Sequence, residues 1–182
     1  SNSSYFNNRD GLIAILCGYA NDYPEALENT LVELGYNYRI DEMRSAIGIV
    51  QLEKLEDDNI RRREIDQIYR ERFVDIYGIK VPFDTKYGVS SHHIFPILLD
   101  KEVNRQGFME FLKSNGIQSS IHYPPIHLFD YYRRNFGCHE GMLYITEEVA
   151  EREVTLPLYP SMTDKDVHRV SDVIVKYFEE RK

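Results

Sequence analysis

The sequence predicts an α+β fold in which helices flank a small and mostly antiparallel sheet. Apolar residues recur at helical spacing over several long stretches, whereas only short segments show the alternation that is typical of strands. Strands and helices do not follow one another in the βαβ order of a parallel sheet, and no internal repeat is visible. At 182 residues the chain has about the length of one domain.

The first part of the chain predicts a short helix, a loop and one long helix. Over 21–33 we expect a turn and then a helix that starts near Pro24, a residue favoured in the first turn of a helix. A loop at 35–39 (GYNYR) follows. A long helix is expected over 41–77, because apolar residues recur there at helical spacing and proline is absent. We expect this helix to bend or break near 56–59, where helix propensity falls.

The rest of the chain predicts shorter elements. Strands are expected over 79–83, 92–99 and 117–123, and helices over 102–115, 145–154 and 163–180. Pro82 and Pro96 place the first two strands at an edge or a bulge. A proline-led loop with a short aromatic helix is expected over 124–137, and an extended segment over 155–160.

Charge and cysteine content exclude several classes of protein. The 22 basic and 30 acidic residues give a net charge of −8, which has the wrong sign for a nucleic-acid partner. Cys17 and Cys138 are too few for a disulfide framework or a four-thiolate metal site, so a cytoplasmic location is the default expectation. The longest apolar stretch, 11–20, is shorter than the roughly 18 residues of a membrane-spanning helix, so no membrane partner is expected.

The histidines do not predict a metal site. His92 and His93 are adjacent, so in a strand their side chains face opposite sides. His122 and His127 flank a proline-stiffened segment, but a third ligand would have to come from the region of Cys138. The simpler interpretation is that these histidines are polar groups of a pocket or of the surface. The chain also has no G-x-S-x-G, G-x-G-x-x-G or P-loop motif, so neither a serine nucleophile nor a glycine-rich phosphate cradle is predicted.

Two loops carry the side chains best suited to binding. In the loop before the long helix, Asn37 and Arg39 can hydrogen-bond a phosphate or pyrophosphate, and the helix N-terminus that follows adds a favourable dipole. The segment after the third predicted strand offers His122, Tyr123 and His127 on a stiff backbone. Taken alone, each loop is more simply explained as a structural turn or a strand exit.

Five segments of the chain, taken in order, follow the motifs of a known family. They are GYNYRIDEMRSAIGIVQLEKL (35–55), RRREIDQIYRERF (61–73), SSHHIFPILL (90–99), NGIQSSIHYPPIHL (115–128) and EREVTLPLYPSMTDKDVHRV (151–170). In these segments the chain resembles the DegT/DnrJ/StrS-type nucleotide-sugar aminotransferases, which depend on pyridoxal phosphate (PLP). Asp41 stands where the family usually has Thr or Ser, and Arg44 and Ser45 replace the commoner Gln and Ala.

The resemblance implies the small C-terminal domain of the type I aminotransferase fold. Residues 1–40 would be the end of the large domain with the GYNYR loop. Residues 41–77 would form the interdomain helix, and residues 78–182 the small domain itself.

The resemblance also implies roles for the two loops. In a homodimer, Asn37 would bind the PLP phosphate in the partner subunit's site, and Arg39 would approach the pyrophosphate of the nucleotide-sugar substrate. His122, Tyr123 and His127 would line the mouth of the sugar-nucleotide site. An amino donor such as glutamate would supply the nitrogen.

One family feature is missing from this chain. The lysine that forms the Schiff base with PLP precedes the GYNYR-like loop in the family, whereas all eight lysines of this chain follow that loop. This lysine carries the covalent and proton-transfer steps, so the chain alone is expected to be inactive and to bind no PLP. We therefore interpret it as the C-terminal part of such an enzyme. The alternative is a non-catalytic domain that binds a sugar nucleotide or has a regulatory role.

Overall fold

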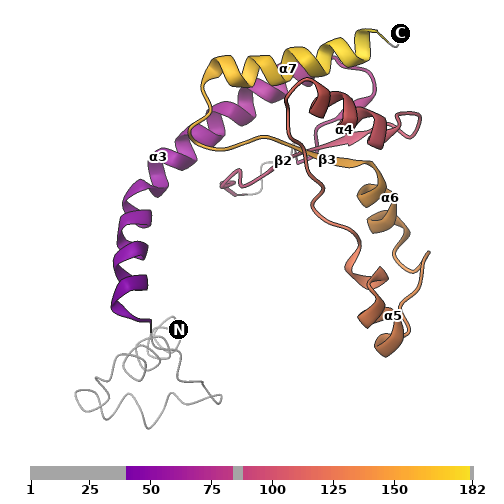
Figure 1. Cartoon of the computed structure of the whole chain (residues 1–182), viewed down its shortest axis with the longest axis horizontal. Helices are drawn as coiled ribbons and strands as arrows, with labels where there is room; N and C mark the ends of the chain where they lie inside the picture. Colours follow the sequence, from indigo (N-terminus) through magenta and orange to yellow (C-terminus); the bar gives the residue numbers. More distant parts are fainter. Residues whose placement is uncertain (1–39, 84–87, 181–182) are drawn as a thin grey trace. The chain divides into compact units, whose positions relative to one another are not determined.

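The computed structural model describes residues 40–83 and 88–180 (Figure 1). The chain divides into two compact units, Ser1–Lys54 and Leu55–Lys182, and their boundary falls inside the long helix α3 (Glu42–Phe73). The described part of the first unit is the start of α3, and the second unit holds the sheet, the other described helices and the core. Across the described ranges, no helix has both the length and the apolar composition that crossing a bilayer requires.

Helix α3 is one continuous helix of 32 residues. Asp41 begins it as predicted, because the Asp41 carboxylate accepts the backbone N–H of Arg44 at 2.8 Å. The break that was one of the two alternatives predicted near 56–59 does not occur, since the helix is continuous through these residues. The other alternative, a bend, stays a prediction. Residues of middling propensity each cost only a few tenths of a kcal/mol in a helix, roughly, and the packed C-terminal turns outweigh that cost.

Three strands form an antiparallel sheet in the order β1-β2-β3. They are β1 (Ile79–Lys80), β2 (Phe95–Leu99) and β3 (Glu153–Leu156). In the central pairing, Phe95 lies opposite Leu156 and Ile97 lies opposite Val154. This confirms the predicted antiparallel sheet. Strand β1 is shorter than predicted, and Pro82 follows it closely, where its missing N–H cannot extend the ladder.

The remaining described helices enclose the sheet or follow it. They are α4 (Arg105–Ser114), the 3-10 helix η1 (Ile126–Leu128), α5 (Asp130–Phe136), α6 (Tyr144–Arg152) and α7 (Asp164–Glu179). The Asn104 side chain caps α4 by accepting the N–H of Gly107 at 2.7 Å. Thr163 and Asp166 form a reciprocal capping box that starts α7. The three longer helices predicted here and the short aromatic helix are confirmed, with slightly shorter bounds.

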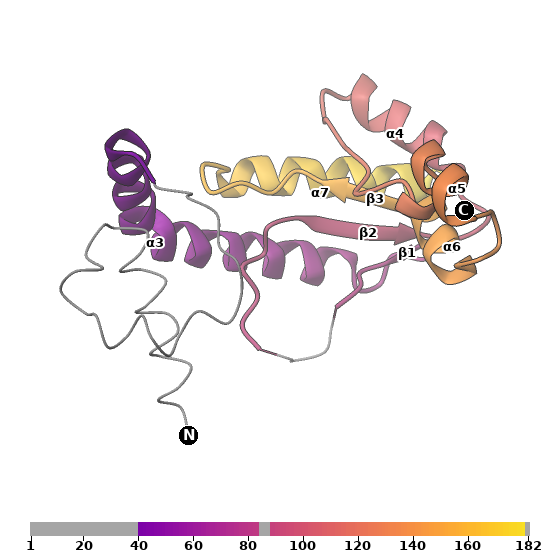
Figure 2. The ribbon, with the colours of Figure 1, turned by 90° about the horizontal axis from the view of Figure 1, so that it is seen from below.

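The core lies where the sheet meets α3, α4 and α7. Figure 2 shows β2 running alongside α7 and the C-terminal part of α3. The ring centroids of Tyr69 and Phe95 are 4.8 Å apart, and those of Phe108 and Tyr177 are 4.9 Å apart. The Tyr69 hydroxyl donates to the carbonyl oxygen of Pro157 at 2.9 Å, so its polar end is satisfied inside the core. Burial raises the pKa of this phenol.

The strand predicted over 117–123 does not form. Within the described residues, its contact with the sheet is a single bridge, in which Ser120 and Thr155 exchange two backbone hydrogen bonds of 2.8 and 3.1 Å. The backbone N–H of His122, two residues later, donates to the side chain of Glu153 instead of a strand carbonyl. The ladder therefore ends after one pair, and the segment leaves the sheet at His122.

Candidate functional site

Three of the five predicted binding residues lie in the described part of the chain: His122, Tyr123 and His127. All three belong to the segment between α4 and α5. The other two predicted residues, Asn37 and Arg39, lie outside the described residues.

His122 is held by two residues of strand β3. Its ring Nδ1 lies 2.9 Å from the hydroxyl oxygen of Thr155, and its backbone N–H donates to Oε2 of Glu153 at 2.9 Å. The Thr155 hydroxyl in turn donates to Oε1 of Glu153. The hydroxyl of Ser120 lies 3.5 Å from Nδ1, at the outer limit of a hydrogen bond. Because Glu153 and Thr155 are both buried, this network holds His122 in place from inside the fold.

Tyr123 follows directly and stands in solvent, with 70% of its surface exposed. The peptide bond between His122 and Tyr123 is cis. The two rings meet edge to face, with centroids 4.7 Å apart. Together they offer an aromatic face and a ring nitrogen side by side, which suits a ligand with both a planar or apolar face and hydroxyl groups.

His127 is buried and paired, unlike Tyr123. Its Nε2 lies 2.8 Å from Oε1 of Glu147 on α6. The Glu147 carboxylate also accepts the backbone N–H groups of Gly141, at 2.8 Å, and Leu143, at 3.1 Å. The Gly141 N–H and the His127 ring hold the pKa of Glu147 below its usual value. Glu147 thus fastens η1 to the loop before α6.

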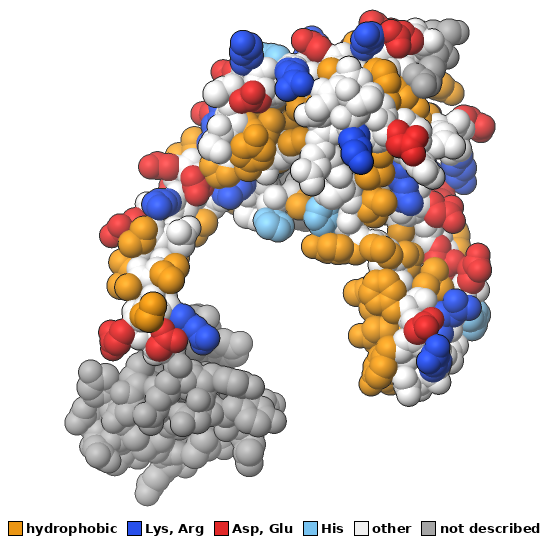
Figure 3. All heavy atoms as spheres, in the orientation of Figure 1, with side chains coloured by type: hydrophobic (Ala, Val, Ile, Leu, Met, Phe, Trp, Pro, Cys, Tyr) orange, Lys and Arg blue, Asp and Glu red, His pale blue; other side chains and the backbone are white. Residues whose placement is uncertain are grey.

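Exposed apolar side chains continue from Tyr123 along η1 and α5. We call this set the aromatic surface; its members are Tyr123, Ile126, Phe129, Tyr131, Tyr132 and Phe136. Figure 3 shows hydrophobic side chains gathered over this part of the chain. Tyr131 packs edge-on to Tyr132 at 5.5 Å, so the surface is partly organised by its own contacts. An exposed apolar patch next to polar side chains is typical of a ligand or protein interface.

A second histidine network links α3 to the segment before β2. The ring Nδ1 of His92 lies 3.1 Å from Oδ1 of the buried Asp66, and Nε of Arg70 lies 2.7 Å from Oδ2 of the same carboxylate. Arg70 also donates to the carbonyl oxygen of Pro82 at 3.2 Å. His92 therefore has a structural partner, whereas its neighbour His93 is exposed. In residues 40–83 and 88–180 no three His, Cys, Asp or Glu side chains gather to hold a metal ion.

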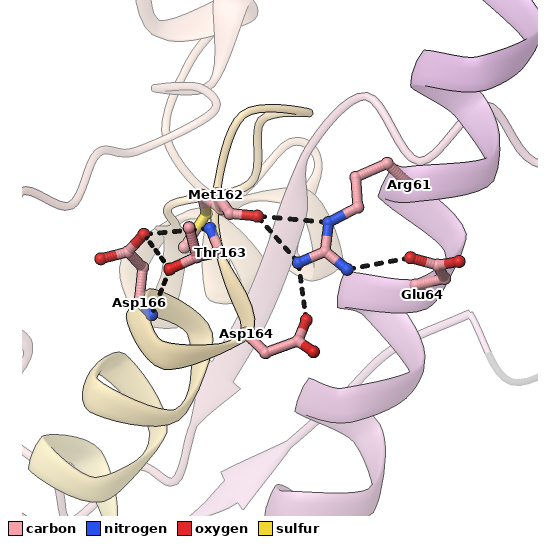
Figure 4. Close-up of polar contacts among 6 residues, drawn as sticks. All are labelled: Arg61, Glu64, Met162, Thr163, Asp164 and Asp166. Carbon is pink, nitrogen blue, oxygen red and sulfur yellow. Dashed lines mark hydrogen bonds and ion pairs between the residues drawn. The ribbon is translucent and has the colours of Figure 1, made fainter.

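Arg61 joins α3 to the start of α7 (Figure 4). Its guanidinium donates to the carbonyl oxygen of Met162 from Nη2 at 2.8 Å and from Nε at 3.2 Å. It also pairs with Asp164 at 2.7 Å and Glu64 at 2.9 Å. These two carboxylates hold the pKa of Arg61 above its usual value. The contact fixes the position of the chain that follows β3.

A cavity of about 430 Å³ opens beside the bridge between Ser120 and Thr155. Polar side chains such as Gln118, Tyr159 and Arg169 share its lining. Arg169 is already engaged, because it donates to the carbonyl oxygen of Asn115 at 2.8 Å. Thr155, the β3 residue that holds His122, is also among the residues that line this cavity.

Comparisons with known proteins agree with this fold. A family model described as the DegT/DnrJ/EryC1/StrS aminotransferase family matches residues 13–175. An uncharacterized protein of Methanocaldococcus jannaschii is 38% identical over 155 residues, which are 84% of this chain and 40% of that protein. The UDP-4-amino-4,6-dideoxy-N-acetyl-beta-L-altrosamine transaminase of Campylobacter jejuni serotype O:23/36 is 31% identical over 157 residues, which are 85% of this chain and 41% of that protein.

A solved structure shows the same architecture. It is Helicobacter pylori PseC, an aminotransferase involved in the biosynthesis of pseudoaminic acid, with a TM-score of 0.73 and 27% identity. The match covers 81% of this chain and 40% of PseC. The fold is thus that of a part of the sugar aminotransferases, which confirms the α+β prediction.

With most of its length matched, the chain belongs to the DegT/DnrJ/EryC1/StrS aminotransferase family. It corresponds to the C-terminal part of its relatives, as the resemblance implied, and spans about 40% of the length of those it matches.

Aminotransferases of this family use PLP, but the described residues do not build a complete PLP site. A Schiff-base lysine must be activated, commonly by desolvation in a pocket. The described lysines are all exposed: Lys54, Lys80, Lys101, Lys113, Lys165 and Lys176. Two of them make surface ion pairs, Lys101 with Glu148 at 2.9 Å and Lys176 with Glu180 at 3.7 Å. No step of the cofactor's chemistry is therefore assigned to the described residues.

The polar partners of the predicted residues could not be found from sequence spacing. Glu153 and Thr155 lie 31 and 33 residues after His122. A usable signal was their separation of two within a strand, which puts both side chains on one face. The predicted helix over 145–154 included Glu153 and so concealed this signal.

Proposed function

We propose that this chain is the C-terminal part of a PLP-dependent aminotransferase that transfers an amino group, from a donor such as glutamate, to a keto sugar linked to a nucleotide. The family match over residues 13–175 carries the proposal. Two relatives support the sugar substrate, because one is a transaminase of a UDP-linked amino sugar and another is a spore coat polysaccharide biosynthesis protein. The enzyme would act in the cytoplasm as a homodimer, in the synthesis of amino sugars or cell-surface polysaccharide.

Each of the predicted residues would have a different role at the site. Asn37 would bind the PLP phosphate in the partner subunit's site, and Arg39 would bind the substrate pyrophosphate through a bidentate contact. His122 and Tyr123 would contact the sugar nucleotide with a ring nitrogen and an aromatic face. The sequence pattern groups His127 with these two as a substrate contact. Its pair with Glu147 favours a supporting role, in which His127 holds the binding segment from behind.

The test uses the full-length enzyme with PLP, glutamate and a panel of nucleotide-linked keto sugars, with the amino-sugar product measured by mass spectrometry. Arg39→Gln should raise KM for the nucleotide sugar more than it lowers kcat, because it removes a contact to the pyrophosphate. A matched control is Arg134→Gln, since the exposed Arg134 pairs only with Asp130 on its own helix among the described residues. Absence of any amino-sugar product with the whole panel would contradict the proposal.

The second candidate is a non-catalytic domain that binds a sugar nucleotide or has a regulatory role. The exposure of every described lysine favours it for the chain acting alone. It predicts nucleotide-sugar binding by this chain without turnover, and it would replace the first proposal if the full-length protein also bound the ligand without converting it.

A further inference from the structure

We propose that Glu153 and Thr155 are positioning residues that hold His122 in a single tautomer, with the proton on Nδ1 and with Nε2 left for the ligand. The place of His122 at the sugar-nucleotide site rests on the proposed function. The tautomer itself rests on hydrogen bonds among described residues, so the two claims can be tested separately.

The hydrogen-bond geometry assigns each proton in the network. An ionised carboxylate only accepts hydrogen bonds, so the hydroxyl of Thr155 points its single proton at Oε1 of Glu153 and donates a hydrogen bond to it. The Thr155 oxygen then has no proton left to offer. Because it lies 2.9 Å from Nδ1 of His122, it must accept, and Nδ1 must carry the proton.

The same carboxylate also fixes the backbone of His122. Oε2 of Glu153 accepts the His122 N–H at 2.9 Å, while Oε1 reaches the ring through Thr155. Glu153 and Thr155 are 4% and 6% exposed, so water competes little for these bonds. The backbone bridge between Ser120 and Thr155 holds the segment and the strand in register.

One ring nitrogen remains for recognition. Among the described residues, Nε2 of His122 makes no hydrogen bond. In the neutral ring that the network selects, Nε2 is a lone-pair acceptor. It would accept a hydrogen bond from a ligand hydroxyl or N–H, such as those of a sugar or a pyrimidine base. The Tyr123 ring beside it would cover a face of the same ligand group.

Replacing the carboxylate by an amide should reverse the tautomer. In Glu153→Gln the amide oxygen has to stay with the His122 N–H, because that backbone donor needs an acceptor. The amide NH₂ group then faces Thr155 and donates to its oxygen. The Thr155 hydroxyl is now free to donate to Nδ1, so the proton of His122 moves to Nε2.

The experiment is a long-range ¹H–¹⁵N NMR spectrum of the histidine rings of the 182-residue chain at about pH 8.5, roughly two units above the ordinary imidazole pKa. The expected wild-type pattern is protonated Nδ1 and bare Nε2 for His122. Glu153→Gln should give the opposite pattern, and Thr155→Val should lose the preference for Nδ1. Thr155→Ser, which keeps the hydroxyl, should retain the wild-type pattern. Unchanged amide spectra elsewhere would show that each variant is folded.

Two results would overturn the proposal: a wild-type His122 protonated on Nε2, or a folded Glu153→Gln chain with an unchanged ring pattern. If Glu153→Gln fails to fold, the comparison of Thr155→Val with Thr155→Ser tests the proposal instead. The same ring pattern in both variants would overturn it.

Titration of the wild-type chain with uridine diphosphate, followed at the Nε2 resonance, tests the ligand role separately. A correct tautomer with no shift at Nε2 in the chain, and no nucleotide-sugar turnover by the full-length enzyme, would contradict the proposed function alone. In that enzyme, Glu153→Gln should raise KM for the nucleotide sugar about tenfold, the value of one hydrogen bond, with little change in kcat.

Discussion

Nη2 of Arg61 lies 2.8 Å from the backbone carbonyl oxygen of Met162, 101 residues further along the chain. Met162 directly precedes the capping box of α7, so this contact ties the start of α7 to α3. The same guanidinium also pairs with Asp164 at 2.7 Å, which strengthens the tie. Arg61 therefore anchors the segment between β3 and α7, in addition to the bond from the Tyr69 hydroxyl to Pro157 in the same segment.

Arg61→Met should destabilise the chain by about 1–2 kcal/mol, because it keeps the apolar stem but removes the charged bonds to Met162 and Asp164. Arg72→Met is the matched control. Arg72 joins the same two helices through Asp172, but the Arg72 side chain is more exposed than that of Arg61, so its loss should cost less than about 0.5 kcal/mol. Urea unfolding followed by far-UV circular dichroism measures both. Equal losses of unfolding free energy in the two variants would show that the contact with the Met162 carbonyl does not stabilise the chain.

Glu147→Gln should lower the stability of the chain at neutral pH, and this difference should shrink as the pH falls. The N–H of Gly141 and the ring of His127 depress the pKa of Glu147 in the folded state. Such a group contributes stability above its unfolded pKa, near 4.5, and this contribution is lost as the pH falls through the lower folded value. Below that value wild type and variant should converge.

Urea midpoints measured from about pH 7 to about pH 3 test this difference. Glu151→Gln is the control, because Glu151 is exposed on the same helix and makes no ion pair among the described residues. A Glu147→Gln difference that stays constant with pH would show that the carboxylate charge plays no part in fastening η1 to α6.

Gly78→Ala should destabilise the chain by about 2 kcal/mol or more. Gly78 has φ 99°, and a Cβ built there would lie 2.6 Å from the Phe178 ring. Gly137→Ala is the matched control, because Gly137 also has a positive φ, 66°, but open space around a Cβ. Its cost should be about 1 kcal/mol, from backbone strain alone. Thermal unfolding measures the melting temperature of both variants. Equal decreases would show that the clash with Phe178 does not contribute to the loss of stability.

The helices could be predicted well because their signals are local. Thr163 and Asp166 are three residues apart, and the capping box they form is readable from that spacing. Asp41 likewise begins α3 within its own first turn. The helix does not break near 56–59, because propensity is a weak signal and α3 gains more from burying Ile65 and Tyr69 than its middle turns lose.

The site could be predicted only in part. The position of His122 and Tyr123 next to a proline-stiffened segment is local, but the hydrogen-bond partners of His122 come from β3. The alternation at 117–123 resembled a strand, yet a strand forms only where a neighbour accepts its backbone bonds. Here the neighbour offers the carboxylate of Glu153 to His122 instead. Tertiary contacts of this kind leave no periodic mark in the sequence.

The chain alone, incubated with PLP and reduced with borohydride, should show no preferred lysine. Every described lysine is exposed, and Lys101 is held at the surface by Glu148 at 2.9 Å. A Schiff-base lysine needs an activating environment, which an exposed side chain does not have. Peptide mapping by mass spectrometry should therefore find weak labelling spread over several lysines. Lys101→Arg should lower the total amount of PLP label only by the share of one lysine among several. One lysine labelled to near completion, with its label abolished by substitution to arginine, would contradict the expectation and place the Schiff base within this chain.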